Sequence, residues 1–165
     1  MTLLVRPATE ADIPRLTETY NHYIVNTAIT FDIEPWTVEQ RREWFTHYAT
    51  TGPHRVLAAE EDGVVLGSAW SSQFRPKRAY HTTIETSVYC APEAVGRGIG
   101  ARLYEALFET LKGQPLHRAL AGITQPNEAS VKLHERFGFK RVGLLSEVGF
   151  KFGQFWDVAW HEKEL

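Results

Sequence analysis

The spacing of hydrophobic residues changes along the chain and predicts where helices give way to strands. Residues 3–6 indicate a short opening strand, and residues 13–24 carry apolar side chains at the spacing of one helix face. Thr37 and Gln40 form a capping box, which predicts a second helix running to about residue 48. The first third of the chain is therefore expected to be mainly helical.

From residue 55 onward the spacing of hydrophobic residues shortens to the spacing that is typical of strands. The turn pair Asp62-Gly63 lies between residues 56–60 and 64–70, and this arrangement predicts a β-hairpin. The rest of the pattern predicts, in chain order, a strand over residues 82–90, a helix over 98–112, a strand over 116–123, a helix over 127–137, and two final strands with turns around Gly149 and Gly153.

The resulting order is β-α-α-β-β-β-α-β-α-β-β, and no repeat, low-complexity tract or linker interrupts it. Such an order suits a mixed, mostly antiparallel sheet with helices on both faces. We therefore expect a single α/β domain over residues 1–165.

Composition narrows the class of protein. Hydrophobic residues make up 43% of the chain and charged residues 23%, which is typical of a globular domain. A net charge of −2 argues against a nucleic-acid-binding surface. The sequence has no run long enough to cross a membrane and no signal-peptide pattern. Its single cysteine, Cys90, cannot form an internal disulfide, so we expect a cytoplasmic protein.

A glycine-rich turn follows the strand over residues 82–90 and opens the next helix. Free backbone N–H groups and the helix dipole make such a turn an anion site, although glycine could also serve there as a plain helix entry. Gly96, Gly98 and Ala101 also fit the dinucleotide-binding spacing. That class needs a carboxylate about 20 residues later, and residues 117–122 contain none. No Gly-Lys-Ser/Thr follows either, which argues against a nucleotide triphosphatase loop.

Further motifs surround this turn. They are Glu85-Thr-Ser-Val-Tyr89 before it, and Pro126-Asn127, His134-Glu135, Gly138-Phe139, residues 148–153 and Trp156-Asp-Val158 after it. With these motifs the chain resembles the GNAT superfamily of N-acetyltransferases, and more closely its phosphinothricin and methionine sulfoximine acetyltransferase branch. One departure is Val95, three residues before Gly98, where the superfamily usually has Gln or Arg.

The resemblance implies the GNAT fold, acetyl-CoA as cosubstrate, and a homodimer. Residues 88–90 would offer main-chain hydrogen bonds to the pantetheine arm, and Asn127 would hold the cosubstrate by its side-chain amide. The cofactor-binding residues implied in this way are Val88, Tyr89, Cys90, Gly96, Arg97, Gly98, Ile99, Gly100, Ala101, Asn127, Ser130 and Arg136.

Transfer of an acetyl group to an amine requires a base, because an ammonium group has no lone pair. Glu85 is the candidate, since a carboxylate in a partly apolar cleft has a raised pKa; the alternative is a solvated strand residue. His134 lies where many superfamily members have a tyrosine that protonates the leaving thiolate, or it only makes a core contact. Cys90 could carry the acyl group, but no base is paired with it, so direct transfer is expected.

The acceptor amine is the open part of the prediction. A basic stretch before Glu85 is either a solvated surface or a clamp for an acidic group of the acceptor. The substrate-binding candidates are Phe31, Arg75, Lys77, Arg78, Glu85, Thr86, Ser87 and Trp156. A protein N-terminus, a polyamine or an aminoglycoside are alternative acceptors, and a non-enzymatic acyl-CoA sensor is the alternative class. The seven histidines have no metal-ligand spacing, so no metal is expected.

Overall fold

The computed structural model describes residues 2–165, and its helices and strands follow the predicted order. The strands are β1 (Leu4–Pro7), β2 (Val56–Glu61), β3 (Val64–Gln73), β4 (Thr83–Cys90), β5 (Arg118–Gln125), β6 (Lys140–Lys151) and β7 (Gln154–Glu164). The α-helices are α1 (Ile13–Asn26), α2 (Val38–Phe45), α3 (Ile99–Leu111) and α4 (Glu128–Arg136), and short 3-10 turns cover Glu10–Asp12, Arg78–Tyr80 and Pro92–Ala94.

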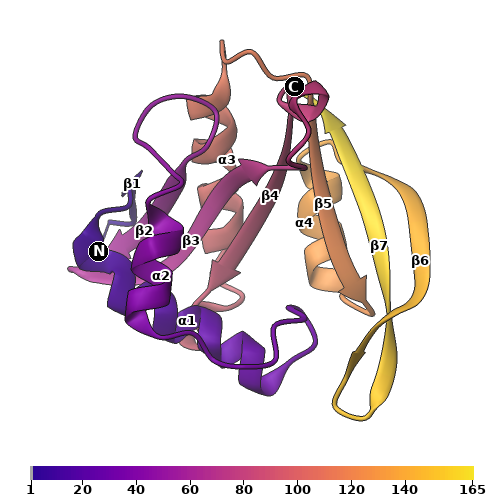
Figure 1. The fold of residues 1–165 in the computed structure, drawn as a ribbon. Coiled ribbons are helices and arrows are strands. Elements are labelled where there is room, and N and C mark those ends of the chain that lie inside the picture. Colours follow the sequence, from indigo (N-terminus) through magenta and orange to yellow (C-terminus); the bar gives the residue numbers. More distant parts are fainter. Residues whose placement is uncertain (1) are drawn as a thin grey trace.

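One sheet runs through the molecule in the order β1-β2-β3-β4-β5-β7-β6. Only β4 and β5 are parallel neighbours, and the other pairs are antiparallel. Helices α1 and α2 cover one face, and α3 and α4 cover the other (Figure 1). The predicted fold class, a mostly antiparallel sheet between helices, is confirmed.

Local sequence signals determine two of these elements. Asp62 and Gly63 both have positive φ, at 51° and 80°, as a tight hairpin turn between β2 and β3 requires. At the start of α2, the hydroxyl of Thr37 accepts the N–H of Gln40 at 3.1 Å, and the Gln40 side chain accepts the N–H of Thr37 at 2.9 Å. The predicted capping box is therefore formed, although the helix ends at Phe45 rather than near residue 48.

The predicted turn around Gly149 is wrong. Gly149 lies inside β6, opposite Trp156 of β7, after an irregularity between Leu145 and Gly149. The hairpin turn is formed by Phe152 and Gly153 alone, both at positive φ. Glycine is needed at 149 for a different reason, because a Cβ there would lie 2.3 Å from the ring of Phe31.

The sheet opens between its two central strands. Parallel pairing of β4 with β5 begins at Thr83 and Arg118 and stops at Glu85 and Leu120, although both strands continue. Figure 1 shows the two strands diverging beyond this point. One edge of β4 after Glu85 is therefore left without a strand partner, and its main-chain groups border an opening in the sheet.

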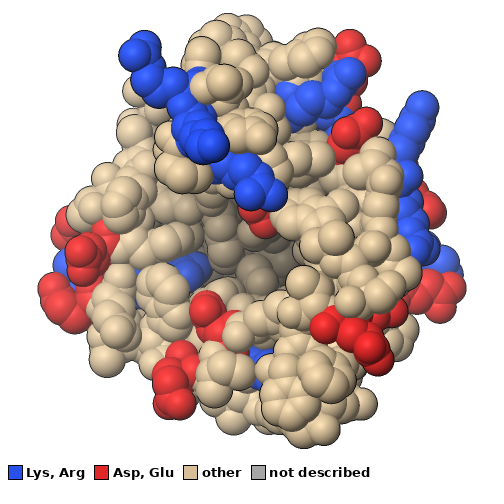
Figure 2. Space-filling view, turned by 45° about the vertical axis from the view of Figure 1, so that its right-hand side comes forward, with Lys and Arg blue, Asp and Glu red and all other residues tan. Residues whose placement is uncertain are grey.

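One face of the molecule is hollowed. When the molecule is turned to bring β6 and β7 forward, a deep hollow lies near the centre of the view, with walls formed mostly of uncharged residues (Figure 2). Lys and Arg side chains gather above it, and Asp and Glu side chains gather around its lower rim (Figure 2).

Candidate active site

The glycine-rich turn joins the end of β4 to α3. Gly96 and Gly98 have φ of +83° and +76°, a conformation that other residues rarely adopt, and a Cβ at either would meet nothing within 4 Å. The first hydrogen bond into α3 runs from the N–H of Arg102 to the carbonyl of Gly98. The N–H groups before Arg102 in the first turn of α3 therefore have no helical partner; that of Gly100 faces the Cys90 sulfur, and its neighbours are available to an anion.

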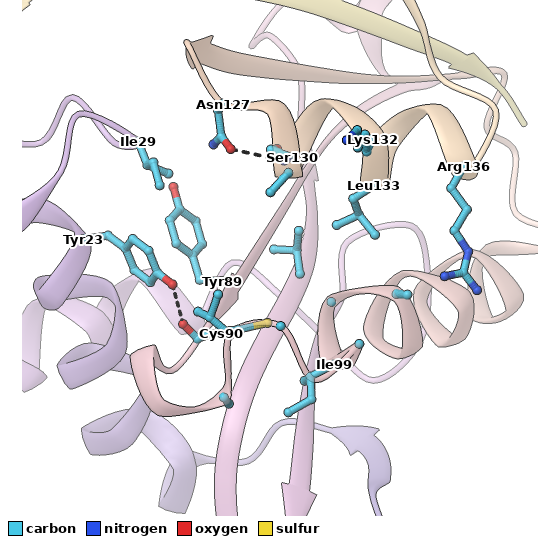
Figure 3. A pocket seen from close by; sticks show the side chains of 18 residues that line it. Tyr23, Ile29, Tyr89, Cys90, Ile99, Asn127, Ser130, Lys132, Leu133 and Arg136 are labelled. Atoms are coloured by element: carbon cyan, nitrogen blue, oxygen red, sulfur yellow. Dashed lines mark hydrogen bonds between the residues drawn. The ribbon is translucent and has the colours of Figure 1, made fainter.

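A cavity of about 440 Å³ lies against this turn, and we call it the turn cavity. Figure 3 shows its walls: Tyr89 and Cys90 from β4, Ile99 from α3, and Asn127, Leu133 and Arg136 from α4 and its start. Its lining is mostly apolar, with glycine backbone at one side and a few polar side chains at the other. This combination suits a long ligand with an anionic part.

Most of the predicted cofactor-binding residues line the turn cavity. They are Val88, Tyr89, Cys90, Gly96, Gly98, Ile99, Gly100, Ala101, Asn127, Ser130 and Arg136. Arg97 does not line it, because its guanidinium forms a salt bridge with Glu61 at 2.6 Å. Val95 does line it, with 63% of its surface exposed, so the position that departs from the superfamily pattern presents an apolar side chain.

Asn127 lies at the start of α4, beside the turn cavity. Its side-chain oxygen accepts the N–H of Ser130 at 3.2 Å, which caps the helix (Figure 3). The side chain also lines the turn cavity, where the sequence predicts that its amide holds the cosubstrate.

Sequence reasoning missed Tyr23 at this cavity. Tyr23 reads as an apolar position of a helix face, but its hydroxyl donates to the carbonyl oxygen of Cys90 at 2.7 Å and its ring lines the cavity (Figure 3). Ile29, Ala129, Lys132 and Leu133 also line it without having been predicted.

Cys90 is half-buried in the wall of the turn cavity. Burial raises the pKa of its thiol to about 11, so the sulfur is protonated at neutral pH. A protonated thiol is a poor nucleophile, and this supports the expectation that Cys90 carries no acyl group.

A second cavity, of about 480 Å³, lies on the α1 and α2 side of β4, and we call it the Glu85 cavity. Burial raises the pKa of the Glu85 carboxyl, and the charge of Arg75 lowers it by a smaller amount. Its carboxylate is therefore a stronger proton acceptor than an exposed glutamate, as a general base requires.

The predicted substrate-binding residues divide into two groups. Phe31, Glu85, Thr86 and Ser87 line the Glu85 cavity, whereas Arg75, Lys77, Arg78 and Trp156 do not. The three basic residues are exposed on the loop before β4, where Arg75 stacks over the ring of Phe74 at 4.9 Å. The indole N–H of Trp156 donates to the carbonyl of Lys151 at 2.9 Å, within the hairpin.

Several unpredicted aromatic residues form the walls of the Glu85 cavity instead. Tyr20, Trp36, Trp44, Trp70 and Trp160 all line it, together with the side chain of Arg41 from α2.

His134 is buried between α4 and β4. Its Nδ1 lies 2.7 Å from the carbonyl oxygen of Ser130, so Nδ1 carries the proton, and its Nε2 lies 2.9 Å from the Tyr104 hydroxyl. The same hydroxyl lies 3.2 Å from Oγ1 of Thr86. The three side chains therefore form a chain of polar contacts that ends on β4, one residue after Glu85.

The two cavities meet where β4 and β5 diverge. A gap of about 60 Å³ is lined by Thr86, Tyr104 and His134; Tyr89 and Ile29 line this gap and both large cavities. A molecule in the turn cavity can therefore approach one in the Glu85 cavity through the opening in the sheet.

Among residues 2–165, no group of three or more His, Cys, Asp or Glu side chains could hold a metal ion. Over the same described range, none of the helices combines the length and apolar character needed to cross a membrane.

Comparisons with known proteins agree with this geometry. The family model described as an acetyltransferase (GNAT) domain matches residues 5–160. The phosphinothricin N-acetyltransferase of Streptomyces coelicolor is 55% identical over 163 residues, which cover 98% of this chain and 95% of that protein. The L-methionine sulfoximine/L-methionine sulfone acetyltransferase of Pseudomonas aeruginosa is 34% identical over 165 residues, covering 100% of this chain and 96% of that protein.

Solved structures have the same fold. A GNAT superfamily phosphinothricin acetyltransferase from Sinorhizobium meliloti, crystallised in complex with acetyl-CoA, matches with a TM-score of 0.92 and 32% sequence identity. The match covers 100% of this chain and 89% of that one.

Proposed function

Because this chain belongs to the GNAT acetyltransferase family, we propose that it moves the acetyl group of acetyl-CoA to the primary amine of a small amino-acid-like acceptor. The acceptor is of the phosphinothricin or methionine sulfoximine type. Membership of the family confirms the resemblance predicted from the sequence, and the chain is therefore an acetyltransferase.

The observation that carries the proposal is the junction of the two cavities beside Glu85. The turn cavity offers unpaired N–H groups for the CoA phosphates and the free edge of β4 for the pantetheine arm. The Glu85 cavity has room for a small amine and contains one carboxylate with a raised pKa. The thioester and the amine would meet at the gap after Glu85.

The chemistry follows from these positions. Glu85 takes a proton from the acceptor ammonium, and the nitrogen lone pair then attacks the acetyl carbonyl carbon. The tetrahedral intermediate collapses as the carbon–sulfur bond breaks, and the thiolate of CoA leaves. The N–H groups on the free edge of β4 are the candidate donors to the oxyanion.

The leaving thiolate takes up its proton at the gap. His134 is the candidate donor in this proposal: its protonated form gives the Nε2 proton to the Tyr104 hydroxyl, 2.9 Å away, as that hydroxyl passes its own proton to the thiolate. Replacing His134 with Gln distinguishes a role in protonating the thiolate from a structural role. The first lowers kcat, whereas the second leaves kcat unchanged once the protein is folded.

His134 also makes stability depend on pH. Burial lowers its pKa below the ordinary value of 6.5, so the unfolded chain binds the proton more readily than the folded one. Stability is full above that value and falls as pH drops through 6.5 toward the lower folded pKa. The thermal midpoint of His134→Gln is therefore expected to fall less than that of the wild type between pH 6.5 and about 5. If the thermal midpoints of the two proteins fell equally over this pH range, another group would be the cause of the acid sensitivity.

The test of the proposed function is release of CoA thiol from acetyl-CoA. Phosphinothricin and methionine sulfoximine are expected to release it faster than spermidine, an aminoglycoside or a peptide with N-terminal alanine. Faster release with any of those three would overturn the acceptor class. Binding of acetyl-CoA with no release for any amine would favour a sensor.

A second copy of this chain is the proposed partner. The edge hairpin of β6 and β7 exposes several large apolar side chains: Val142, Leu144, Leu145, Val148, Phe150, Phe152 and Phe155. Of these, Leu145 and Val148 also line the Glu85 cavity, so a dimer formed here would border it.

The double variant Phe150→Asp/Phe155→Asp tests this dimer, because two buried carboxylates would disrupt an apolar interface. We expect light scattering to report the wild type as a dimer and the double variant as a monomer. The control is Val64→Asp, which changes an apolar residue on β3 that is also at least half exposed. A monomeric wild type would overturn the proposal.

A further inference from the structure

The segment that joins α1 to α2 forms part of the wall of both large cavities. It covers residues 27–37 and contains no helix or strand. Thr30 and Phe31 line the Glu85 cavity, and Ile29 lines the Glu85 cavity, the turn cavity and the gap between them. We call residues 29–31 the acceptor wall, because their position decides how much room an acceptor has beside Glu85.

Two residues of β6 hold the acceptor wall. The ammonium group of Lys151 donates to the carbonyl oxygen of Thr30 at 2.9 Å, and Gly149 lies against the ring of Phe31. Gly149 and Lys151 are both buried and lie two positions apart, so they share the face of the strand that is turned toward the wall. Phe150 lies between them on the opposite face, where 61% of its surface is exposed.

The ring of Phe31 occupies the space that a side chain at position 149 would need. A Cβ there would lie closer to two carbons of this ring than non-bonded carbon atoms approach. Phe31 lines the Glu85 cavity and Gly149 does not, so the ring lies between the glycine and the cavity. The missing side chain at 149 therefore determines how far the ring stands back from an acceptor.

Lys151 provides the polar part of the contact. Only 4% of its surface is exposed, and its ammonium group also lies 5.2 Å from the ring centre of Phe152. A hydrogen bond donated by a cation is stronger than one between neutral groups. Because this bond ends on a main-chain oxygen of Thr30, it restrains the path of the chain and not a single side chain.

Helix α1 holds the acceptor wall from the other side. The Tyr20 hydroxyl lies 2.9 Å from Oγ1 of Thr30 and donates to Oδ2 of Asp32 at 2.6 Å. Helix α1 packs on β3 and β4, whereas β6 lies beyond β5 and β7 on the other side of the opening in the sheet. The acceptor wall therefore spans the opening, and its place depends on one anchor from each half of the sheet.

We propose that Gly149 and Lys151 are positioning residues, which fix the acceptor wall and so set the space that the Glu85 cavity offers to an acceptor. The inference rests on the proposed acetyl transfer. Gly149 acts through the ring of Phe31, and Lys151 acts through the main chain of Thr30. Neither positioning residue lines the cavity itself.

Gly149→Ala tests the contact with Phe31. The added methyl group should push the ring toward the cavity and raise KM for methionine sulfoximine by at least about 10-fold, the usual effect of one methylene in a pocket. The Kd for acetyl-CoA should stay the same, because Phe31 does not line the turn cavity. The control is Gly143→Ala on the same strand, where a Cβ would meet nothing within 4 Å and KM should not change.

Removing the ring distinguishes this effect from general damage to β6. In a Phe31→Ala background, Gly149→Ala should change KM for methionine sulfoximine by less than about twofold, because the two mutations remove the same contact. A 10-fold rise in KM in both backgrounds would overturn the role of Gly149.

Lys151→Met tests the contact with Thr30. Methionine has a similar length and can remain buried, but it cannot donate to the carbonyl. Loss of this charge-assisted hydrogen bond should raise KM for methionine sulfoximine by about 10-fold and leave the Kd for acetyl-CoA unchanged. The control is Lys140→Met, which changes an exposed lysine at the start of β6 and should not change KM.

Hydrogen exchange shows whether the wall itself has been released. Main-chain amides of residues 27–36 should exchange faster in Lys151→Met than in the wild type, and at the wild-type rate in Lys140→Met. Faster exchange together with an unchanged KM for methionine sulfoximine would leave Lys151 a structural residue and overturn its role in acceptor binding.

Acceptor binding without acetyl-CoA separates this inference from the proposed function. Four of the five tryptophans line the Glu85 cavity, so their fluorescence should report the binding of methionine sulfoximine: Trp36, Trp44, Trp70 and Trp160. If the wild type bound it and released no thiol, acetyl transfer would be refuted, and a weaker Kd in Gly149→Ala and Lys151→Met would still support the inference. Rapid acetylation with the same Kd and KM in the wild type and both variants would refute the roles of Gly149 and Lys151 alone.

Discussion

Replacing Glu85 with Gln is expected to lower kcat by about 10²–10⁴-fold at neutral pH, the usual contribution of a general base. Gln has nearly the same shape, so the acceptor should still bind and its KM should change little. The side chain cannot take a proton from the ammonium, and only the small fraction of amine that is already neutral can react. Steady-state thiol release with methionine sulfoximine measures the effect.

The pH profile tests the same role independently. Burial raises the pKa of Glu85 above 4.5, and the base works only when deprotonated, so wild-type kcat should fall as pH drops through that raised value. In Glu85→Gln this acid limb should disappear, and the rate should instead rise with pH as more of the free amine becomes neutral. Glu93→Gln, which changes an exposed carboxylate, is the control. A near-normal kcat and an unchanged acid limb in Glu85→Gln would exclude Glu85 as the base.

The order of helices and strands was predictable because each depends on residues close together in the chain. The Asp62-Gly63 hairpin and the Thr37 capping box are local signals, and both form as expected. A turn at Gly149 was predicted from the same kind of local signal, and this prediction was wrong. There the glycine serves a distant contact with the ring of Phe31, and local sequence cannot distinguish this use of glycine from a turn.

The turn cavity was largely predictable for a similar reason. Its lining comes mainly from one strand-turn-helix unit and the start of α4, so consecutive motif residues face the same space. Arg97 is the exception within the turn, because its partner Glu61 comes from the distant hairpin of β2 and β3.

The acceptor side was less predictable because its walls come from many separate segments. Trp156 lies on the same face of β7 as Val158 and Trp160, which line the Glu85 cavity. It is nearer to the turn of the β6–β7 hairpin than they are, and it does not line the cavity. Arg41 is buried by rings from α1, α2, β3 and the segment before α2. No period in one helix reveals that a charged residue will be enclosed by such a set.

Replacing Gly98 with Ala is expected to raise KM for acetyl-CoA by about 100-fold while stability falls only modestly. Gly98 has a φ of +76°, and alanine in this left-handed conformation costs about 1–2 kcal/mol. Rotating the peptide relieves that strain but turns the N–H groups of the turn away from the phosphates. Each charge-assisted hydrogen bond to an anion contributes about 1.5–3 kcal/mol, so losing one and straining the rest accounts for the expected factor.

Gly113 gives a closely matched control for this prediction. It has a φ of +79°, a Cβ there would also meet nothing within 4 Å, and it follows the other end of α3, away from the turn cavity. Gly113→Ala should therefore lower the thermal midpoint about as much as Gly98→Ala and leave KM for acetyl-CoA unchanged. If both variants raised KM equally, general backbone strain would explain the effect. If neither did, the free N–H groups of the turn would not be the anion site.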